Sequence, residues 1–361
     1  MKTLITKYRK IIIIVILLVF VLLSTSFVIV DLLQNLNYHP LLVVLVEMTI
    51  LLLCILGLVY VGIKKNIITF SKRLYWSIGI YVGQNPYKFH PAENVKNPVL
   101  TAANVTDLKA DFVADPFMVK ENSTWYMFFE VLNSLTGHGN IGLAVSEDGY
   151  SWDYKQVILK EPFHLSYPYV FEWQKKYYMI PECATANSIR LYEAEEFPYH
   201  WSFVGALLEG KQYSDTSIIR FKNKWWIFTC PEPEKHDTLL LFYADELTGP
   251  WMHHPKSPIV KCNAKIARSG GRFLVFKDRI IRYAQDCVPT YGRNVLAFEI
   301  TRLTQTDYQE RDISANPILK ANGSGWNTHG MHHIDPHRLD NGMWIACVDG
   351  YRKYLTIQIE Y

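Results

Sequence analysis

The sequence lacks the cysteine patterns that build disulfide frameworks or bind zinc. Its six cysteines include no CxxC pair; Cys54 lies in an apolar run and the other five are scattered. Scattered, unpaired thiols are typical of a reducing compartment. Glycine-rich nucleotide motifs of the Walker or Rossmann type are also missing, so a nucleotide donor would need an unconventional site. A net charge of +3 gives no reason to expect a nucleic-acid partner.

Two long apolar runs lie near the N-terminus. Residues 11–30 carry no charged side chain, and residues 41–63 carry only Glu47. Each run is long enough to cross a hydrocarbon core about 30 Å thick. The first run is too long for a signal-peptide core, and no small-x-small cleavage site follows it. Residues 1–63 are therefore predicted to form an uncleaved, two-helix membrane anchor.

The positive charges predict the orientation of this anchor. Lysines and arginines precede the first run and follow the second, whereas the intervening loop has none. Because positive residues stay on the cytoplasmic side, both termini and the large domain are expected in the cytoplasm. Residues 64–96 are predicted to be a basic and aromatic connector, suited to contact with anionic lipid.

The remainder of the chain carries an internal repeat. Helical periodicity is nearly absent after residue 100, and short aromatic and β-branched runs recur between turn residues, which is typical of all-β domains. The repeated hairpins are 115–130, 167–182, 215–230, 270–285 and 333–350. Their spacing of about 50 residues is that of propeller blades. Residues 97–361 are therefore predicted to form a five-bladed β-propeller.

In this prediction the fifth blade has only three strands before the sequence ends. The segment NPVL at 97–100 copies NPIL at 316–319 and SPIV at 257–260. We therefore expect residues 97–100 to supply the missing outer strand and close the ring, which hides an exposed sheet edge.

Polar residues recur where the first strand of a blade begins and its second strand ends, and these two points lie at the same mouth of a propeller. Convergent carboxyl groups raise one another's pKa, and glycosyl chemistry needs a carboxyl pair with separated pKa values. The predicted catalytic residues are Asp115, Asp215 and Glu182. The predicted substrate-binding residues are Glu130, Tyr167, Arg268, Asp286, His332, His333 and Asp335, and Gln285 and Asp349 are placed at the same mouth.

Each of these residues also has a structural interpretation. Asp115 and Asp215 are equally suited to capping turns, and Glu130 and Glu182 to pairing with an arginine. His332 and His333 are compatible with a ligand, a ring-lining donor or a satisfied core histidine. No ligand spacing supports a metal site, so no cofactor is expected, although Ca²⁺ at the axis is compatible with the residue types.

Several segments resemble known families. ADPF at 114–117, the following WYMFFE strand and the SEDGYSW turn resemble the five-bladed propeller glycosidases, which include the arabinanase, xylosidase and invertase families. A longer series, from NPYKFHPAENVKNPVLTAANV to WWIF, resembles the N-terminal domain of plant glucosamine inositolphosphorylceramide transferases over most of residues 85–350.

The resemblance implies a different expectation for each of the site residues. Asp115 matches the general base of the arabinanases, and Asp215 stands where they have a glutamic acid as the proton donor. The second-blade aspartate that tunes this acid has no counterpart, because the site reads Tyr167-Pro168-Tyr169. These departures argue against ordinary arabinanase-type hydrolysis. In the plant transferases, the sugar transfer is attributed to a separate C-terminal domain.

The sequence therefore predicts a membrane-anchored carbohydrate-active enzyme that transfers or hydrolyses a glycosyl unit on a lipid-linked or cell-envelope glycan. Its expected partners are a carbohydrate or glycolipid substrate and the membrane. The alternative is a non-catalytic glycan-binding or scaffold propeller that assists a partner glycosyltransferase. The sequence leaves open the sugar, the acceptor lipid and the choice between hydrolysis and transfer.

Overall fold

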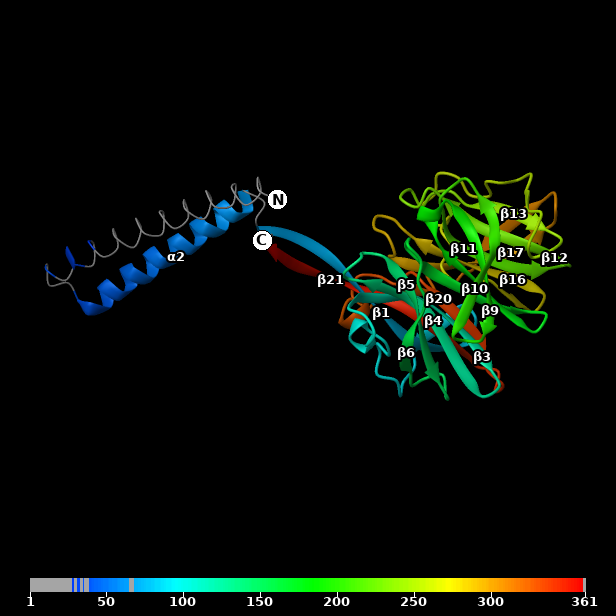
Figure 1. Cartoon of the computed structure of the whole chain (residues 1–361), viewed down its shortest axis with the longest axis horizontal. Helices are drawn as coiled ribbons and strands as arrows, with labels where there is room; N and C mark the ends of the chain where they lie inside the picture. The colour runs from blue at the N-terminus through cyan, green and yellow to red at the C-terminus, as the bar shows by residue number, and fades with distance from the viewer. Residues whose placement is uncertain (1–27, 29–30, 33–34, 36–38, 65–67, 360–361) are drawn as a thin grey trace. The chain divides into compact units, whose positions relative to one another are not determined.

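The computed structural model describes residues 28, 31–32, 35, 39–64 and 68–359 of the chain (Figure 1). The chain divides into two compact units. One unit comprises residues 1–73 and 354–361, and the other comprises Leu74–Lys353.

Helix α2 (Pro40–Lys64) occupies the second predicted apolar run. Its part from Val44 to Lys64 is long and apolar enough to cross a membrane, and its most apolar 18-residue window contains no buried residue. A helix of this kind near the N-terminus is a membrane anchor or a signal sequence. It is the one such helix among the described residues, rather than the two predicted. The run at 11–30 lies almost entirely outside the described residues, so the two-pass topology and its orientation stay predictions.

Five sheets, four of them with four strands and one with five, confirm the predicted propeller. The first contains β3 (Ala110–Glu121), β4 (Thr124–Asn133), β5 (Gly139–Ser146) and β6 (Asp153–Leu159). The second contains β7 (Ser166–Trp173), β8 (Lys176–Glu182), β9 (Ser188–Glu196) and β10 (His200–Glu209). The third contains β11 (Tyr213–Phe221), β12 (Lys224–Pro231), β13 (Leu240–Ala244) and β14 (Met252–His253).

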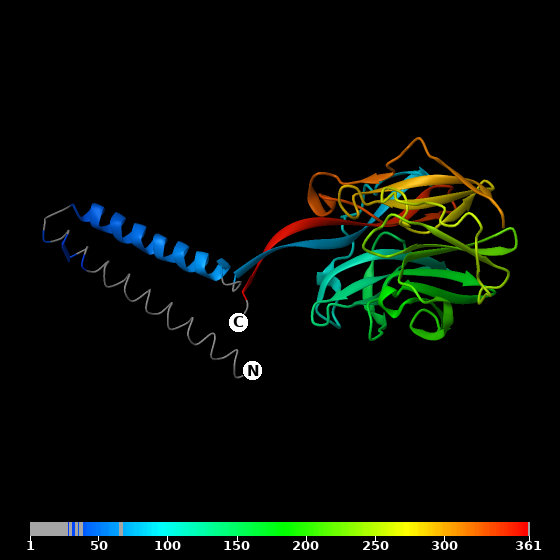
Figure 2. The ribbon, with the colours of Figure 1, turned by 90° about the horizontal axis from the view of Figure 1, so that it is seen from above.

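The fourth sheet contains β15 (Leu274–Phe276), β16 (Arg279–Asp286), β17 (Asn294–Leu303) and β18 (Tyr308–Asp312), with β19 (Leu319–Lys320) added beside β17. The fifth joins the two ends of the chain in the order β2–β1–β21–β20. Its strands are β1 (Ile68–Asn85), β2 (Lys88–Pro91), β20 (Ile334–Arg338) and β21 (Trp344–Ile359). Figures 1 and 2 both show β1 beside β21, blue against red.

The fifth sheet corrects two expectations. Residues 64–96 are not merely a connector, because β1 and β2 lie within them and supply the third and fourth strands of this blade. The third strand was missed because Trp76–Tyr81 is buried without a break, so it lacks the alternation of a half-buried strand. The closing strand is therefore β1, and the propeller begins before residue 97.

The segment at 97–100 supplies one bridge of the predicted outer strand, because Leu100 pairs antiparallel with Ile78 of β1. The Asn97 side chain bonds both the N–H and the C=O of Ile80 in β1, at 2.8 and 2.9 Å. Asn316 in the copy at 316–319 makes the same pair of bonds to Ala297 in β17, at 2.7 and 2.8 Å. The repeat is therefore real, but its function is to clamp the third strand of a blade.

Large apolar side chains fill the spaces between neighbouring sheets. Ile78, Trp125, Trp152 and Ile345 form one such core between the fifth and first sheets. Burial of each such side chain contributes about 1.5–3 kcal/mol relative to exposure. These cores fix the sheets around the axis, and so hold the ends of the inner strands in place.

Candidate active site

The same backbone device begins the innermost strand of the first three blades. Asp115, Tyr167 and Asp215 have φ angles of 52°, 45° and 44°. Each lies where the pairing between the first and second strands of its blade slips by one residue. A bulge of this kind re-aims a side chain, and the left-handed conformation costs a non-glycine residue roughly 1–2 kcal/mol. The left-handed conformation occurs in all three blades despite this cost. At each of these positions it changes the direction of the side chain.

Four residues, which we call the Arg268 group, lie together on the third-blade side: Asp215, Arg268, Glu182 and Gln285. The Arg268 guanidinium donates to Asp215 at 2.5 Å through Nε and to Glu182 at 3.4 Å through Nη2. The Gln285 amide also donates to Asp215, at 2.5 Å. The Glu182 carboxyl in turn accepts the backbone N–H of Asp215 at 3.0 Å.

Three residues, which we call the His332 group, lie on the first-blade side: Asp115, His332 and Asp349. The Asp349 carboxylate accepts His332 Nδ1 at 2.8 Å and the backbone N–H of Asp115 at 3.0 Å. His332 Nε2 then lies 3.6 Å from Asp115 Oδ1. In both groups, a carboxyl at the end of one blade's second strand holds the N–H of the left-handed aspartate that opens the next blade.

Burial and neighbouring charges separate the protonation states of the Arg268 group. Burial and the Asp215 charge raise the pKa of Glu182 well above its usual value. Burial also pushes the pKa of Asp215 upward, but Arg268 outweighs this effect and holds that pKa below its usual value. Two adjacent carboxyls are thereby set as one neutral acid and one carboxylate.

The His332 group contains a carboxyl that titrates near neutral pH. Burial raises the pKa of Asp115 to about 7, against the opposing effect of His332. Asp215 also raises this pKa, so the two groups interact electrostatically. For His332, burial lowers the pKa, but Asp349 outweighs it and the net shift is upward.

The raised pKa of Asp115 predicts a pH-dependent stability. Between about pH 4 and pH 7 the folded chain binds a proton at Asp115 that the unfolded chain has released, so the free energy of unfolding falls as pH rises. The full loss is about 4 kcal/mol as an upper bound. Asp115→Asn should therefore stabilise the chain at pH 8 by about 2–4 kcal/mol and have little effect at pH 4.

Denaturant unfolding of the full chain in detergent at both pH values measures this difference. Glu195→Gln, which alters an exposed carboxyl, is the control and should change stability equally little at both pH values. Equal effects of Asp115→Asn at the two pH values would contradict a raised pKa.

Glu130 belongs to the same mouth and has a partner that the sequence analysis missed. Burial and the neighbouring carboxyls raise the pKa of Glu130 well above its usual value. His164 Nδ1 accepts the N–H of Gly139 at 2.9 Å, so the ring proton lies on Nε2, which is 3.4 Å from Glu130 Oε1. The His164 side chain is 33 % exposed and so connects this carboxyl to solvent. Its loop position before β7 carried no signal in the repeat.

Three of the predicted binding residues belong to neither the Arg268 group nor the His332 group. Each of them bonds to groups that shape the fold. Tyr167 is fully buried, and its hydroxyl accepts the N–H of Gly271 at 2.8 Å and donates to the C=O of Gly271 at 3.0 Å. Asp335 accepts the N–H of Met118 and Arg272 Nε, both at 2.5 Å. Asp286 accepts the N–H of Val288 at 3.1 Å and so shapes a loop.

His333 lies beside the His332 group but faces the interior. It is fully buried, and its ring packs edge-on against Phe117 and Tyr167. Burial lowers its pKa to about 4, so the ring is neutral. Its backbone N–H, at 3.1 Å, donates to Asp349. His333 therefore contributes its main chain to the site, and its ring Nδ1 also lies 3.8 Å from Asp115 Oδ1.

Aromatic residues that the sequence analysis did not single out complete the mouth. The Trp76 indole stacks on His332 with ring centroids 3.9 Å apart. The Tyr291 ring lies 5.1 Å from the Arg268 guanidinium and 5.2 Å from the His332 ring. Trp76 was missed because it lies in the segment expected to be a connector.

The His332 group could also hold a cation. Asp115, His332 and Asp349 each offer one ligand atom, and these atoms lie within 4.8 Å of one another. Two carboxylate oxygens and one imidazole are fewer oxygens than Ca²⁺ takes, so water would have to complete its shell. The expectation that the chain has no cofactor therefore stays a prediction.

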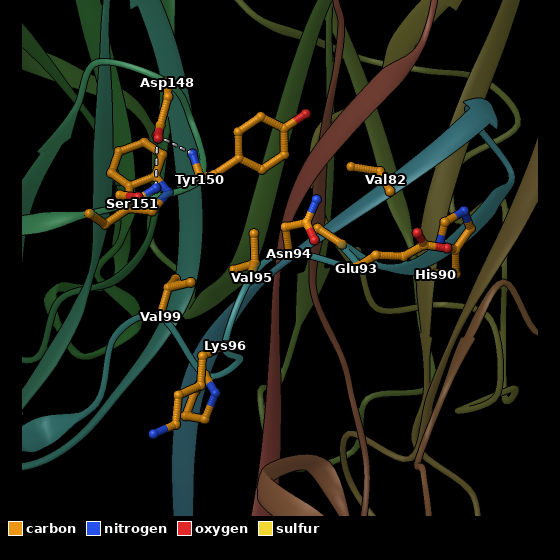
Figure 3. A pocket seen from close by; sticks show the side chains of 13 residues that line it. Val82, His90, Glu93, Asn94, Val95, Lys96, Val99, Asp148, Tyr150 and Ser151 are labelled. Atoms are coloured by element: carbon orange, nitrogen blue, oxygen red, sulfur yellow. Dashed lines mark hydrogen bonds between the residues drawn. The ribbon is translucent and has the colours of Figure 1, made fainter.

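A groove of about 890 Å³ lies apart from these residues (Figure 3). One wall is formed by the segment after β2, and the other by the β5–β6 turn. Its lining residues are Val82, His90, Ala92, Glu93, Asn94, Val95, Lys96, Pro98, Val99, Asp148, Tyr150, Ser151 and Trp152. None of them belongs to the Arg268 or His332 group. Asp148 in this wall is occupied by the N–H groups of Tyr150 and Ser151, at 2.7 and 2.8 Å. The titratable groups therefore favour the mouth as the candidate site.

Solved structures share the fold. A putative glycoside hydrolase from Parabacteroides distasonis aligns with a TM-score of 0.55 and 10% identity, over 73% of this chain and 97% of that one. The catalytic domain of the GH62 α-L-arabinofuranosidase of Coprinopsis cinerea gives 0.51 and 11%, over 77% and 97%. At this identity the likeness shows the propeller fold alone.

Sequence relatives are more similar. Residues 71–351 match the family described as glucosamine inositolphosphorylceramide transferase 1, N-terminal. The rice protein (Oryza sativa subsp. japonica) named glucosamine inositolphosphorylceramide transferase 1 is 36% identical over 298 residues, which are 77% of this chain and 40% of that protein. The Arabidopsis thaliana protein of the same name is 33% identical, over 77% and 39%. The chain thus spans about two fifths of the length of these relatives, and it belongs to the glucosamine inositolphosphorylceramide transferase 1 N-terminal family.

Proposed function

We propose that the chain is a membrane-anchored carbohydrate-active enzyme whose propeller mouth transfers or hydrolyses a glycosyl unit on a glycolipid. The observation that carries the proposal is the separation of protonation states at the mouth. Glu182 is held neutral, its neighbour Asp215 is held ionised by Arg268, and Asp115 titrates near pH 7. Glycosyl chemistry needs this combination of an acid and a base.

The residue roles follow from these protonation states. Glu182 carries the proton that a leaving glycosidic oxygen requires, and Asp215 tunes it through their shared environment. Asp115 takes the proton of the attacking water or acceptor hydroxyl, and His332 stabilises its carboxylate. This assignment differs from the one that the resemblance implied, in which Asp215 is the acid, because Arg268 opposes protonation of Asp215.

The lipid part of the proposal has separate support. Helix α2 ends at Lys64, and Trp76 of the mouth follows it after about a dozen residues. The relatives are named as transferases of inositolphosphorylceramide, so a glycolipid of that class is the first substrate to test.

A second candidate function is a glycan-binding or scaffold propeller that assists a partner glycosyltransferase. It is favoured by Tyr167, which occupies the place of the tuning carboxylate and is wholly engaged in packing.

Turnover by the full chain in detergent distinguishes the two. Wild type, Asp115→Asn, Glu182→Gln and the control Glu195→Gln are incubated with an inositolphosphoceramide and a panel of activated glycosides and nucleotide sugars, and products are identified by mass spectrometry. We expect the two site variants to lose turnover at least tenfold while still binding sugar, and the control to match wild type. Unchanged turnover in both site variants would overturn the catalytic proposal. Sugar binding without turnover in wild type would favour the binding module.

A further inference from the structure

We infer that Trp76, in the N-terminal strand β1, is a positioning residue for His332 of the candidate active site. By this inference β1 has two tasks: it closes the ring of blades, and it orients a group of the mouth. The inference rests on the proposed function, in which His332 faces the base Asp115.

The contact between the two rings is close and fully enclosed. The indole and imidazole are stacked, with centroids 3.9 Å apart and planes inclined by 23°. Trp76 is 3% exposed and His332 is 2% exposed. The Tyr351 ring also packs against the indole, with the two ring centroids 4.5 Å apart. Together these contacts leave the imidazole no free space on the indole side.

The adjoining chain is shaped to this stack. Gly292 has a φ of 67°, and a Cβ at this position would lie 2.8 Å from the Trp76 ring and 3.3 Å from His332 Cβ. Only a residue without a side chain therefore fits here, both for conformation and for space. The loop that carries Tyr291 is thus fitted around the Trp76–His332 pair.

Two contacts together fix the direction of His332 Nε2. The bond from Nδ1 to Asp349 holds one edge of the ring at 2.8 Å, but by itself it leaves the ring plane free to rock. The indole stack holds the ring plane. With both constraints, Nε2 faces Asp115 Oδ1 at 3.6 Å, an oxygen that has no hydrogen-bond partner among the described residues.

A merely structural role for Trp76 predicts something else. Trp76 packs with Ala114 and Tyr351, so its loss would destabilise the chain in any case. Trp125 is a matched control, because it is equally buried at 4% exposure but lies in the core between the fifth and first blades, away from His332. Trp76→Phe is the conservative variant, since it keeps an aromatic face.

The test measures the motion of the His332 ring at one fixed pH, by ¹³C NMR relaxation of the full chain in detergent with ¹³C-labelled histidine, the resonance being assigned from its loss in His332→Asn. We expect Trp76→Leu to lower the order parameter of this ring by about 0.2 or more, Trp76→Phe to lower it less, and Trp125→Leu to leave it unchanged. An unchanged order parameter in Trp76→Leu, or an equal change in Trp125→Leu, would overturn the inference. Because the ring motion is read without substrate, absence of turnover in wild type would count against the proposed function alone.

Discussion

Replacement of Arg268 by methionine is expected to lower the free energy of unfolding by about 3–5 kcal/mol near neutral pH. The guanidinium is almost completely buried, and it is the cation that pairs with both Asp215 and Glu182. It also donates to the C=O of Pro233 at 3.1 Å. Methionine fills much of the volume but leaves the ionised Asp215 carboxylate in a site with little solvent. The cost is that of an uncompensated buried charge.

The effect of Arg268→Met should depend on pH with a definite sign. In wild type, Arg268 depresses the pKa of Asp215, so this carboxylate contributes stability above the unfolded pKa of about 4 and loses it as pH falls below that value. In the variant, the largest remaining effect on the Asp215 pKa is burial, which raises it, while Glu182 and His332 oppose it more weakly. The carboxyl can then be neutralised by a proton at acid pH. The difference between wild type and variant should therefore be large at pH 7.5 and smaller at pH 4.

Denaturant unfolding of the full chain at these two pH values measures the difference. Arg279→Met is the matched control, because Arg279 pairs with Glu299 at 3.3 Å but its side chain is 59% exposed. Exposed pairs of this kind contribute little. The double variant Arg268→Met/Asp215→Asn removes the orphan charge and should recover part of the loss. If Arg268→Met proved no more destabilising than Arg279→Met, the Arg268 group would not be the buried ion pair described above.

The fold was predictable from the sequence where the repeat could be aligned without gaps. The hairpins that carry Asp115 and Asp215 share a length, a turn and a polar first residue, and their common φ angle shows why that residue recurs. The fifth blade was predictable only in part. Its third strand, β1, is buried on both faces around Trp76, so its sequence carries no alternation that distinguishes it from a connector.

The positions of the candidate-site residues could be predicted from the sequence to within one or two residues. An error of one residue, however, places a side chain on the opposite face of its strand, and so changes which side chains meet. Gln285 reaches Asp215, whereas its neighbour Asp286 points to the opposite face of the strand and shapes a loop. Asp335 lies three positions after His332 in the sequence. At about 3.3 Å per residue, this spacing places Asp335 farther along the strand and away from the mouth. Its partner there is Met118, which lies three positions beyond Asp115.

Replacement of Gly271 by alanine is expected to have the largest effect on folding, a loss of more than about 4 kcal/mol. Gly271 has a φ of 137°, and a Cβ there would lie 1.7 Å from the C=O oxygen of Ile334. This is backbone in the adjoining blade, with which Gly271 forms a bridge. The clash can be relieved only by separating the two blades. Separation would also break the bonds between Gly271 and the Tyr167 hydroxyl.

Gly323→Ala is the matched control, because Gly323 also has a positive φ, of 71°, but no atom lies within 4 Å of an added Cβ. It should cost only the conformational strain, roughly 1–2 kcal/mol. Urea unfolding of the full chain, with near-ultraviolet circular dichroism as a second signal, compares the two variants. Equal stabilities would show that the blades separate at this point without cost. The Tyr167 hydroxyl would then not be essential to the packing at the axis. Such a result would favour the earlier prediction that Tyr167 binds substrate at the mouth. A large difference, by contrast, would support the interpretation that the Tyr167 hydroxyl serves the packing between blades at the axis.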